Sequence, residues 1–231
     1  LYNDRGVPVR FTWTNSLLEE KHIYDTYCNL IMKEADNGMN QVLVNRPVLE
    51  EYIRRQYPGF KLISSTTKRI TGLDGLLEEL NKDYFLVVLD YDLNHNEEVL
   101  SAIGKQADKV EILVNEICYP GCPKRSEHYR QQSQMQLEYD IDAAFPCPNK
   151  TRERKFEECK ERPSFISREQ IREYADRGFV NFKIVGRGMP MDFVKESYLY
   201  YLVKDDSRAF IRNKMESTLN QFAQAMRKRK A

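Results

Sequence analysis

Six short stretches of the chain are nearly continuous in β-branched, aliphatic and aromatic residues, and polar residues follow each of them. They cover residues 7–14, 41–45, 61–66, 84–90, 110–115 and 181–185. A strand with one face in water alternates apolar and polar residues, whereas a continuous apolar run is typical of a parallel strand that is covered on both faces. The pattern therefore predicts parallel strands and argues against an antiparallel sandwich.

Helical patterns lie between and after these strands. Apolar residues at three- and four-residue spacings predict helices over 16–35, 47–57, 73–81, 97–105, 167–177, 191–203 and 207–230. Asn15 or Ser16 is a candidate N-cap for the first helix, and Pro47 suits the first turn of the second. Because strand and helix alternate at a period of about 20 to 30 residues, the chain reads as repeated βα units.

The predicted fold class is α/β, and the predicted architecture is a TIM-like (β/α) barrel. Six βα units are fewer than a closed eight-stranded barrel needs, so we expect the barrel to be incomplete at its N-terminus, the alternative being an open sheet. We assign 1–206 to the barrel, with 118–164 as an inserted cysteine-rich loop after the fifth strand. Residues 207–231 are expected to form a C-terminal helix that packs on the barrel or extends from it.

Charged side chains follow three of the hydrophobic runs directly. In parallel α/β folds the chemistry collects at the carboxyl ends of the strands. Asp90, Glu116 and Arg187 should point into the mouth of the barrel, where a lone charge is costly. We predict catalytic roles for them, because a carboxylate pair opposite an arginine could bind an anionic substrate or position a hydroxyl. A satisfied salt-bridge network is the alternative.

Uncharged polar residues at the other strand ends are candidates for substrate binding. These residues are Asn15, Asn45, Ser65, Thr67 and Asn115. A purely structural interpretation exists for Asn15, Asn45 and Thr67, because turns from strand to helix recruit such residues as N-caps.

Four of the five cysteines fall within 118–164, whereas Cys28 lies among apolar residues of a predicted helix and reads as a core thiol. The four are Cys118, Cys122, Cys147 and Cys159, separated by three, 24 and 11 residues. Thiolates suit zinc or iron–sulfur clusters, and four ligands fill either kind of site. A [4Fe–4S] cluster, a structural zinc ion, buried free thiols and disulfides all remain open. His128, in the same segment, is a candidate ligand, acid–base group or surface residue.

Charge and composition limit the possible partners. The net charge is +1, so no whole-molecule field favours nucleic acid, although 150–155 and the basic tail could form a local RNA-binding surface. The sequence contains no run of about 18 apolar residues and no apolar signal core near its start, which predicts a cytoplasmic protein without a membrane span. A small-molecule substrate or a partner protein is therefore expected.

Two segments resemble the collagenase-like "peptidase" family, whose members include iron–sulfur proteins of oxygen-independent ubiquinone hydroxylation and RNA hydroxylation enzymes. The first is the strand 111–114 followed by Cys118, Gly121, Cys122 and Ser126, and the second is 182–187, ending in Gly186 and Arg187 before a helix with Tyr198, Tyr200 and Tyr201. The similarity covers about residues 109–201. It implies a TIM-like barrel with a [4Fe–4S] cluster near its mouth on Cys118, Cys122, Cys147 and Cys159, and an oxidative, hydroxylation-type activity more than proteolysis.

Three functions follow from these observations. The first is an iron–sulfur enzyme of redox or hydroxylation type, or an accessory to one, with Glu116, Asp90 and Arg187 at the substrate site. The second is a non-catalytic barrel that binds a ligand or partner and holds zinc or free thiols. The third is a hydrolase, although the sequence contains no Gly-x-Ser-x-Gly elbow and no His-Glu-x-x-His pair.

Overall fold

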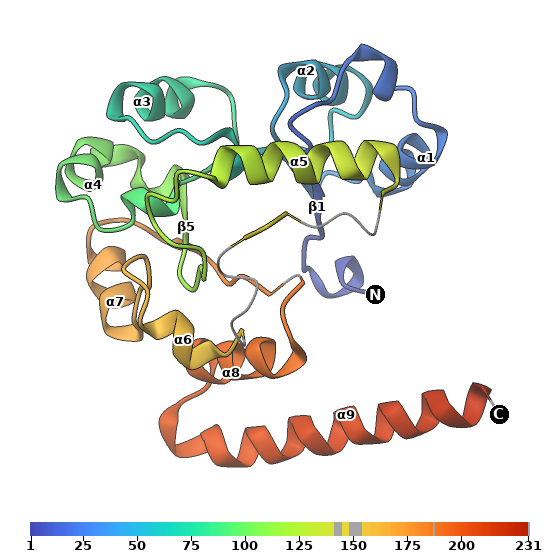
Figure 1. Ribbon diagram of the computed structural model, residues 1–231, viewed down its shortest axis with the longest axis vertical. Coiled ribbons are helices and arrows are strands. Elements are labelled where there is room, and N and C mark those ends of the chain that lie inside the picture. Colours follow the sequence, from blue (N-terminus) through green and yellow to red (C-terminus); the bar gives the residue numbers. More distant parts are fainter. Residues whose placement is uncertain (141–144, 148–153, 187, 231) are drawn as a thin grey trace.

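The computed structural model describes residues 1–140, 145–147, 154–186 and 188–230 (Figure 1). Six strands form one parallel sheet in chain order. They are β1 (Arg10–Trp13), β2 (Gln41–Val44), β3 (Lys61–Ser64), β4 (Leu86–Val88), β5 (Val110–Leu113) and β6 (Asn181–Lys183). All six predicted strands are present, each shorter than its apolar run.

The sheet is apolar on both faces, as the continuous runs predict. On β2, Val42 and Val44 belong to the large core between the sheet and the helices. Leu43, between them, points the other way and joins Ile63, Leu86, Val88 and Leu113 in a smaller core on the concave face. Successive side chains of a strand point to opposite faces, so both layers need apolar residues.

Five helices cover the convex side of the sheet: α1 (Thr26–Ala35), α2 (Pro47–Gln56), α3 (Leu73–Asn81), α4 (Glu97–Ile103) and α7 (Arg168–Asp176). Figure 1 shows them around the outside of a C-shaped arrangement. The first begins ten residues later than the pattern 16–35 predicts. Asp25 is its N-cap, because its side chain accepts a 2.7 Å hydrogen bond from the backbone N–H of Cys28.

The sheet is open, so the expectation of a TIM-like barrel is wrong. Within the described residues β1 and β6 are the two edges and do not pair with each other. The architecture is an open half-barrel of the α/β class. Alternating βα units are common to open sheets and closed barrels, and the hydrophobic pattern of a strand does not record whether the two outermost strands meet.

An ion pair across the concave face shows how strongly the sheet curves. Nη1 of Arg10 on β1 lies 2.7 Å from both carboxylate oxygens of Glu111 on β5. Four strand spacings separate β1 from β5, which is about 19 Å in a flat sheet. Fully extended, the two side chains span only about 12 Å. The contact therefore requires the sheet to bend around it.

The segment 118–164, expected as a loop, contains two helices within its described residues, α5 (Arg125–Glu138) and α6 (Phe156–Lys160). The residues of α5 are mostly Gln, Glu and Arg, which favour helices intrinsically but form no apolar stripe. Helices α8 (Met191–Leu202) and α9 (Arg208–Lys230) end the chain. Short 3-10 turns lie at Asn3–Arg5, Glu20–His22, Thr66–Lys68, Tyr91–Leu93, Gly104–Lys109 and Asp205–Ser207. None of the described helices is long and apolar enough to cross a membrane.

Candidate functional site

Helix α5 lies across the carboxyl edge of the sheet and is anchored at two points (Figure 1). Near its start, Nη1 of Arg125 donates a 2.9 Å hydrogen bond to Asp92, which follows β4. Two turns later, Oγ of Ser133 accepts a 3.0 Å hydrogen bond from the N–H of Ser16, which follows β1, and its carbonyl accepts one from Asn15. Eight helical residues span about 12 Å, close to the three strand spacings of about 14 Å from β4 to β1. The helix therefore bridges the mouth of the half-barrel.

A network of buried and half-buried ion pairs holds the first anchor. Asp90 and Asp92 both contact Arg69 and Arg125, and the Arg125 side chain is 1% exposed. Burial raises the pKa of Asp90, and the two guanidinium groups oppose that shift. The pKa of Asp92 is lowered, because hydrogen bonds from Arg69, Gly121 and Arg125 outweigh the effect of burial. Arg69 adopts a φ of 58°, an uncommon left-handed conformation for a residue with a side chain.

Beside this network, Glu116 stands in a group of weak acids. Its carboxylate oxygen Oε1 accepts a 2.9 Å hydrogen bond from the N–H of Cys118. Burial raises the pKa of Glu116, and the backbone N–H groups of Cys118 and Ile117 together with the charge of Arg125 only partly offset it. Burial also raises the pKa of the Cys118 thiol, while Tyr91 and Arg125 lower it. Burial therefore favours the protonated form of this carboxyl more than it does for an exposed glutamate.

Two tyrosines complete this group. Burial raises the pKa of Tyr91 above its ordinary value, and Tyr129, Glu116 and Cys118 add to the effect. Burial raises the pKa of Tyr129 on α5 to about 12, with Glu116 contributing. We call Tyr91, Glu116, Cys118 and Tyr129 the acid cluster. The pKa of each of the four is raised, so the protonated form of each is favoured relative to the same group in water.

The predicted metal ligands are brought together only in part. Cys159 on α6 is buried, and its Sγ lies 3.7 Å from the carbonyl oxygen of Glu116. Burial raises its pKa to about 12. Cys118 contacts the same glutamate, whereas Cys122 and Cys147 are half-buried. In the part of the chain that the structure describes, no three or more His, Cys, Asp or Glu side chains form a group that could hold a metal ion. The described residues therefore do not gather the four thiols into one site. A [4Fe–4S] cluster or zinc ion on these cysteines stays a prediction.

A cleft of about 940 Å³ opens at the other anchor of α5. Its walls come from the end of β1, the turn before α1, α2 and the last turns of α5. The amide and aromatic side chains that line it are Asn15, Asn29, Gln132, Gln136, Trp13, Tyr52 and Tyr139. Amide groups offer both donors and acceptors, and the aromatic rings offer apolar surface, so the cleft suits an uncharged ligand with hydrogen-bonding groups. Cys28, predicted as a core thiol, is half-buried and lines this cleft.

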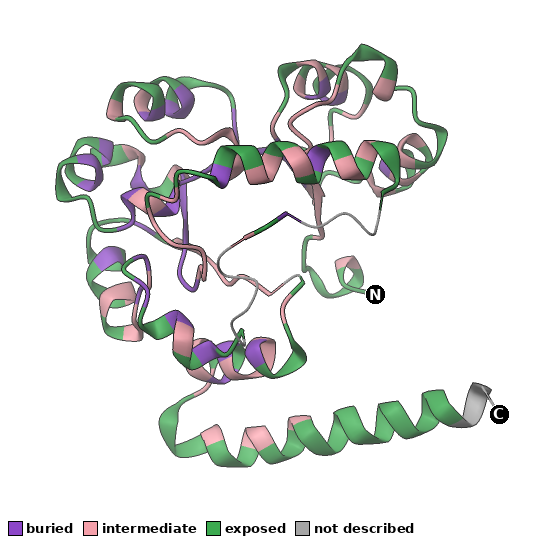
Figure 2. Ribbon diagram, in the orientation of Figure 1, coloured by how far each residue is buried: buried purple, intermediate pink, exposed green. Residues whose placement is uncertain are grey.

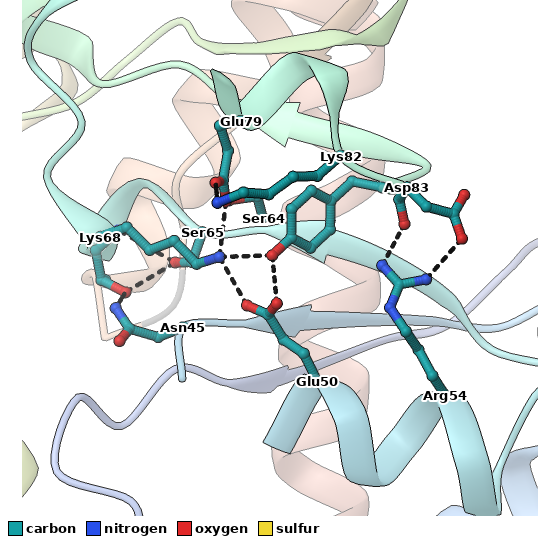
Figure 3. Close-up of polar contacts among 11 residues, drawn as sticks. Asn45, Glu50, Arg54, Ser64, Ser65, Lys68, Glu79, Lys82 and Asp83 are labelled. Atoms are coloured by element: carbon teal, nitrogen blue, oxygen red, sulfur yellow. Dashed lines mark hydrogen bonds and ion pairs between the residues drawn. The ribbon is translucent and has the colours of Figure 1, made fainter. Parts of the chain in front are cut away.

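Three predicted substrate-binding residues are bound to one another. Asn45 donates a 2.9 Å hydrogen bond to Oγ1 of Thr67, and the hydroxyls of Ser65 and Thr67 are 2.9 Å apart (Figure 3). Figure 3 also shows Lys68, the next residue, between Glu50 and Glu79 in a buried network. These contacts fasten the turn after β3 to α2 and α3.

Of the remaining predicted site residues, Asn115 and His128 contact other parts of the fold, and Arg187 lies outside the described residues. Asn115 is fully buried, accepts from the N–H of Val185 at 2.6 Å and donates to Ser197 on α8 at 3.1 Å, so it joins two segments of the fold. The ring of His128 stacks on Phe145 at 4.4 Å, and burial lowers its pKa.

Sequence reasoning missed the two arginines and the tyrosine at the centre of the site. Arg69 and Arg125 do not follow strands directly, so a search for charged residues at strand ends passes over them, and Tyr91 carries no charge for such a search to find. One signal was available, because Asp90 and Asp92 flank Tyr91 after a buried strand, and carboxylates that are buried or half-buried require cationic partners. That signal does not identify which arginines pair with the two aspartates.

Comparisons with known proteins give a sequence relative and a solved structure, and no family model matches the chain. An uncharacterized protease of Methanocaldococcus jannaschii is 27% identical over 184 residues, which cover 77% of this chain and 54% of that protein. The chain therefore spans about half the length of this curated relative. The solved U32 peptidase Mk0906 superposes with a TM-score of 0.51 at 18% identity, over 81% of this chain and 73% of that one. The chain is thus similar in sequence to a protein named as a protease and shares the fold of a U32 peptidase, in agreement with its collagenase-like resemblance.

Proposed function

We propose that this chain is a member of the collagenase-like, U32 peptidase-type family that binds an extended polypeptide segment in the cleft under α5 and transfers protons through Glu116. The peptide as ligand follows the names of the two similar proteins, a protease and a peptidase. Glu116 as the acting group follows from its surroundings. A hydrolase is the third of the functions that the sequence leaves open.

The observation that carries the proposal is the half-buried Glu116 carboxyl with its raised pKa. A general acid or base works best when its pKa lies near the working pH, and burial moves a carboxyl in that direction. The Cys118 thiol is a poor alternative, because its raised pKa leaves little thiolate to act as a nucleophile. The chemistry proposed is therefore acid–base catalysis by a carboxyl group rather than a cysteine mechanism.

The position of α5 connects the cleft to the acid cluster. Tyr129 belongs to the cluster, and Gln132 and Gln136, three and seven residues further along α5, line the cleft. These offsets correspond to about 5 and 10 Å along the helix axis. A peptide two or three residues long, at about 3.3 Å per residue, covers that distance. The ligand would then lie along α5, with its amide groups against the amide side chains of the cleft.

Binding can be measured directly, because Trp13 is the only tryptophan of the chain and lines the cleft. We expect titration with gelatin peptides to change the tryptophan emission in a saturable way. Turnover is followed with fluorescein-labelled gelatin and casein. In Glu116→Gln, which keeps the shape and the acceptor oxygen, we expect unchanged binding and cleavage reduced about 100-fold or more.

The matched control is Glu138→Gln, a carboxyl-to-amide change at the exposed end of α5. It should leave both binding and cleavage within twofold of the wild type. Binding without cleavage in the wild type supports the non-catalytic, ligand-binding function instead. Absence of both contradicts the proposal.

An iron–sulfur enzyme of redox or hydroxylation type is the second candidate, and one observation favours it. Cys118 and Cys159 belong to segments 41 residues apart, yet both contact Glu116. The complete four-thiol set is not gathered, so we assign no chemical step to a cluster. Anaerobic reconstitution followed by metal analysis tests this candidate. About four iron and four sulfide per chain with broad absorbance near 400 nm support it, and colourless, iron-free protein contradicts it.

A further inference from the structure

Helix α9 extends well beyond the helix on which it packs. Its 23 residues span about 35 Å, whereas the 12 residues of α8 span about 18 Å. Two ion pairs fasten its first half to α8, Lys195 to Glu216 at 2.9 Å and Arg212 to Glu196 at 2.6 Å. Beyond Met215, Figure 2 shows α9 coloured as exposed as far as residue 227. About half of this helix is therefore exposed in the part of the chain that the structure describes.

An apolar seam runs along α9 and continues past α8. Met215, Leu219, Phe222 and Met226 follow one another at spacings of four, three and four residues, the repeat of a helix that packs along another helix. The first part of the seam forms one wall of a groove of about 370 Å³, whose other wall includes Met191 and Tyr198 of α8. Further along, Phe222 is 65% and Met226 41% exposed.

The same helix carries a strong positive charge. In sequence, α9 contains seven Lys and Arg residues and one Glu, a net charge of +6, which leaves −5 on the rest of the chain. The net charge of +1 is therefore the sum of a strongly basic helix and an acidic remainder of the chain. Such a helix attracts a negatively charged partner and repels a copy of itself.

We infer that the α8–α9 groove and the distal half of α9 bind an acidic amphipathic helix of a partner protein, whose apolar residues complete the seam and whose carboxylates face the basic residues of α9. This is helix-in-groove recognition, with apolar anchors at three- and four-residue spacing and charge selecting the partner. The inference is independent of the function proposed for the carboxyl edge.

Two other occupants fit the observations less well. A second copy of the chain would bring two helices of charge +6 together in the seam. An anionic membrane would match the charge. However, the seam is a narrow stripe of one residue in three or four, whereas a helix that lies in a membrane surface presents a broad apolar face. The uncharged polar residues Asn220, Gln221 and Gln224 limit the width of the apolar seam on α9.

The test uses the full chain and a designed acidic heptad peptide, with Leu at the a and d positions and Glu at the flanking positions, labelled with fluorescein. A second peptide replaces every Glu with Lys. By fluorescence anisotropy we expect saturable binding of the acidic peptide, at least tenfold tighter than that of the basic one. We also expect binding to weaken about tenfold between 0.05 and 0.5 M salt, because the charges are exposed.

Phe222→Asp should weaken binding of the acidic peptide at least tenfold. Phe210→Asp is its matched control, since Phe210 is 68% exposed on the same helix but lies about 180° around it from Leu219. It carries the same charge change, and should leave binding within threefold. Circular dichroism of both variants checks that the helix is retained.

Three results would overturn the inference. One is equal or absent binding of the two peptides. Another is binding of phosphatidylserine vesicles in sedimentation without binding of the peptide, which would assign the surface to membranes. The third is concentration-dependent dimerisation in light scattering that Phe222→Asp abolishes, which would assign it to a second copy of the chain.

Discussion

Nη1 of Arg10 on the first strand lies 2.7 Å from both carboxylate oxygens of Glu111 on the fifth, across the concave face of the sheet. The Glu111 side chain is 6% exposed and that of Arg10 25%. This pair links two strands that are not neighbours in the sheet, and it does so from inside the half-barrel. It is a structural substitute for part of the closure that the open sheet lacks.

Removing one charge of this pair should be costly. Glu111→Leu leaves the Arg10 guanidinium facing the apolar concave core, and we expect a loss of about 2–3 kcal/mol in the free energy of unfolding, measured in urea. The double variant Arg10→Met with Glu111→Leu should recover more than half of that loss, because the Arg10 charge is removed together with its partner, while Lys183, 3.8 Å from Glu111, is the same in the single and double variants. Equal losses in the single and double variants would contradict this account.

The network around Lys68 should make stability depend on acid. Glu79 is 3% exposed, and although burial alone would raise its pKa, hydrogen bonds from Lys68, Lys82 and Ser64 lower it to about 2 (Figure 3). Because the pKa is depressed in the folded state, the stabilisation is complete above the unfolded value of 4.5 and is lost as pH falls toward 2. The loss amounts to about 3 kcal/mol.

The measurement is the free energy of unfolding between pH 2 and 7 for the wild type and Glu79→Gln. The two curves should be parallel above pH 5 and converge below it, since the variant cannot titrate at this position. Curves that stay parallel down to pH 2 would show that Glu79 does not titrate as described.

The two anchors of α5 should differ in strength. Arg125→Met leaves Asp90 and Asp92 with one arginine fewer at a buried site, so we expect a loss of about 3 kcal/mol in global stability. Ser133→Ala removes one acceptor from Ser16 and should cost about 1 kcal/mol.

Hydrogen exchange distinguishes local from global effects in these variants. In Ser133→Ala the amides in the last turns of α5 should exchange about fivefold faster, with the strands unchanged. In Arg125→Met protection should fall throughout the sheet. If amide exchange in Ser133→Ala became faster by the same factor throughout the molecule, the Ser133 contact would not be what holds α5.

The cysteines should react with iodoacetamide at very different rates. Burial raises the pKa of Cys159 to about 12, so at pH 8 only about one thiol in 10,000 is ionised, and the side chain is also inaccessible. We expect mass spectrometry to find Cys159 unmodified in the native chain and fully modified in 6 M urea. Rapid native modification of Cys159 would show that α6 opens in solution.

The positions of all six strands follow from the sequence, because a parallel strand that is buried on both faces must be apolar at every position. The helices with an apolar stripe are found for a similar reason. Helix α5 is missed since its contacts with the sheet are polar, through Arg125 and Ser133, and polar contacts leave no periodicity to read. The early start predicted for α1 failed at Asp25, where a local cap outweighed the apolar pattern upstream.

The residues of the candidate site also divide into those that the sequence identifies and those that only the structure places. Asp90 and Glu116 could be identified from the sequence, because a carboxylate directly after a buried strand is costly and needs a reason. The sequence could not place Arg69 and Arg125 beside Asp90, since those contacts join residues 21 and 35 positions apart. Nor could it show that Cys118 and Cys159 meet at Glu116 while the four thiols do not form one group.

By itself, then, the sequence determined the α/β class, the strand order along the chain and the edge at which the polar groups gather, because these depend on local periodicity and on which residues tolerate burial. Only the tertiary structure decided that the sheet stays open, that α5 bridges its mouth and that the cysteines separate. Closure, bridging and ligand geometry depend on distances between segments far apart in the chain, and no local pattern of residues encodes those distances.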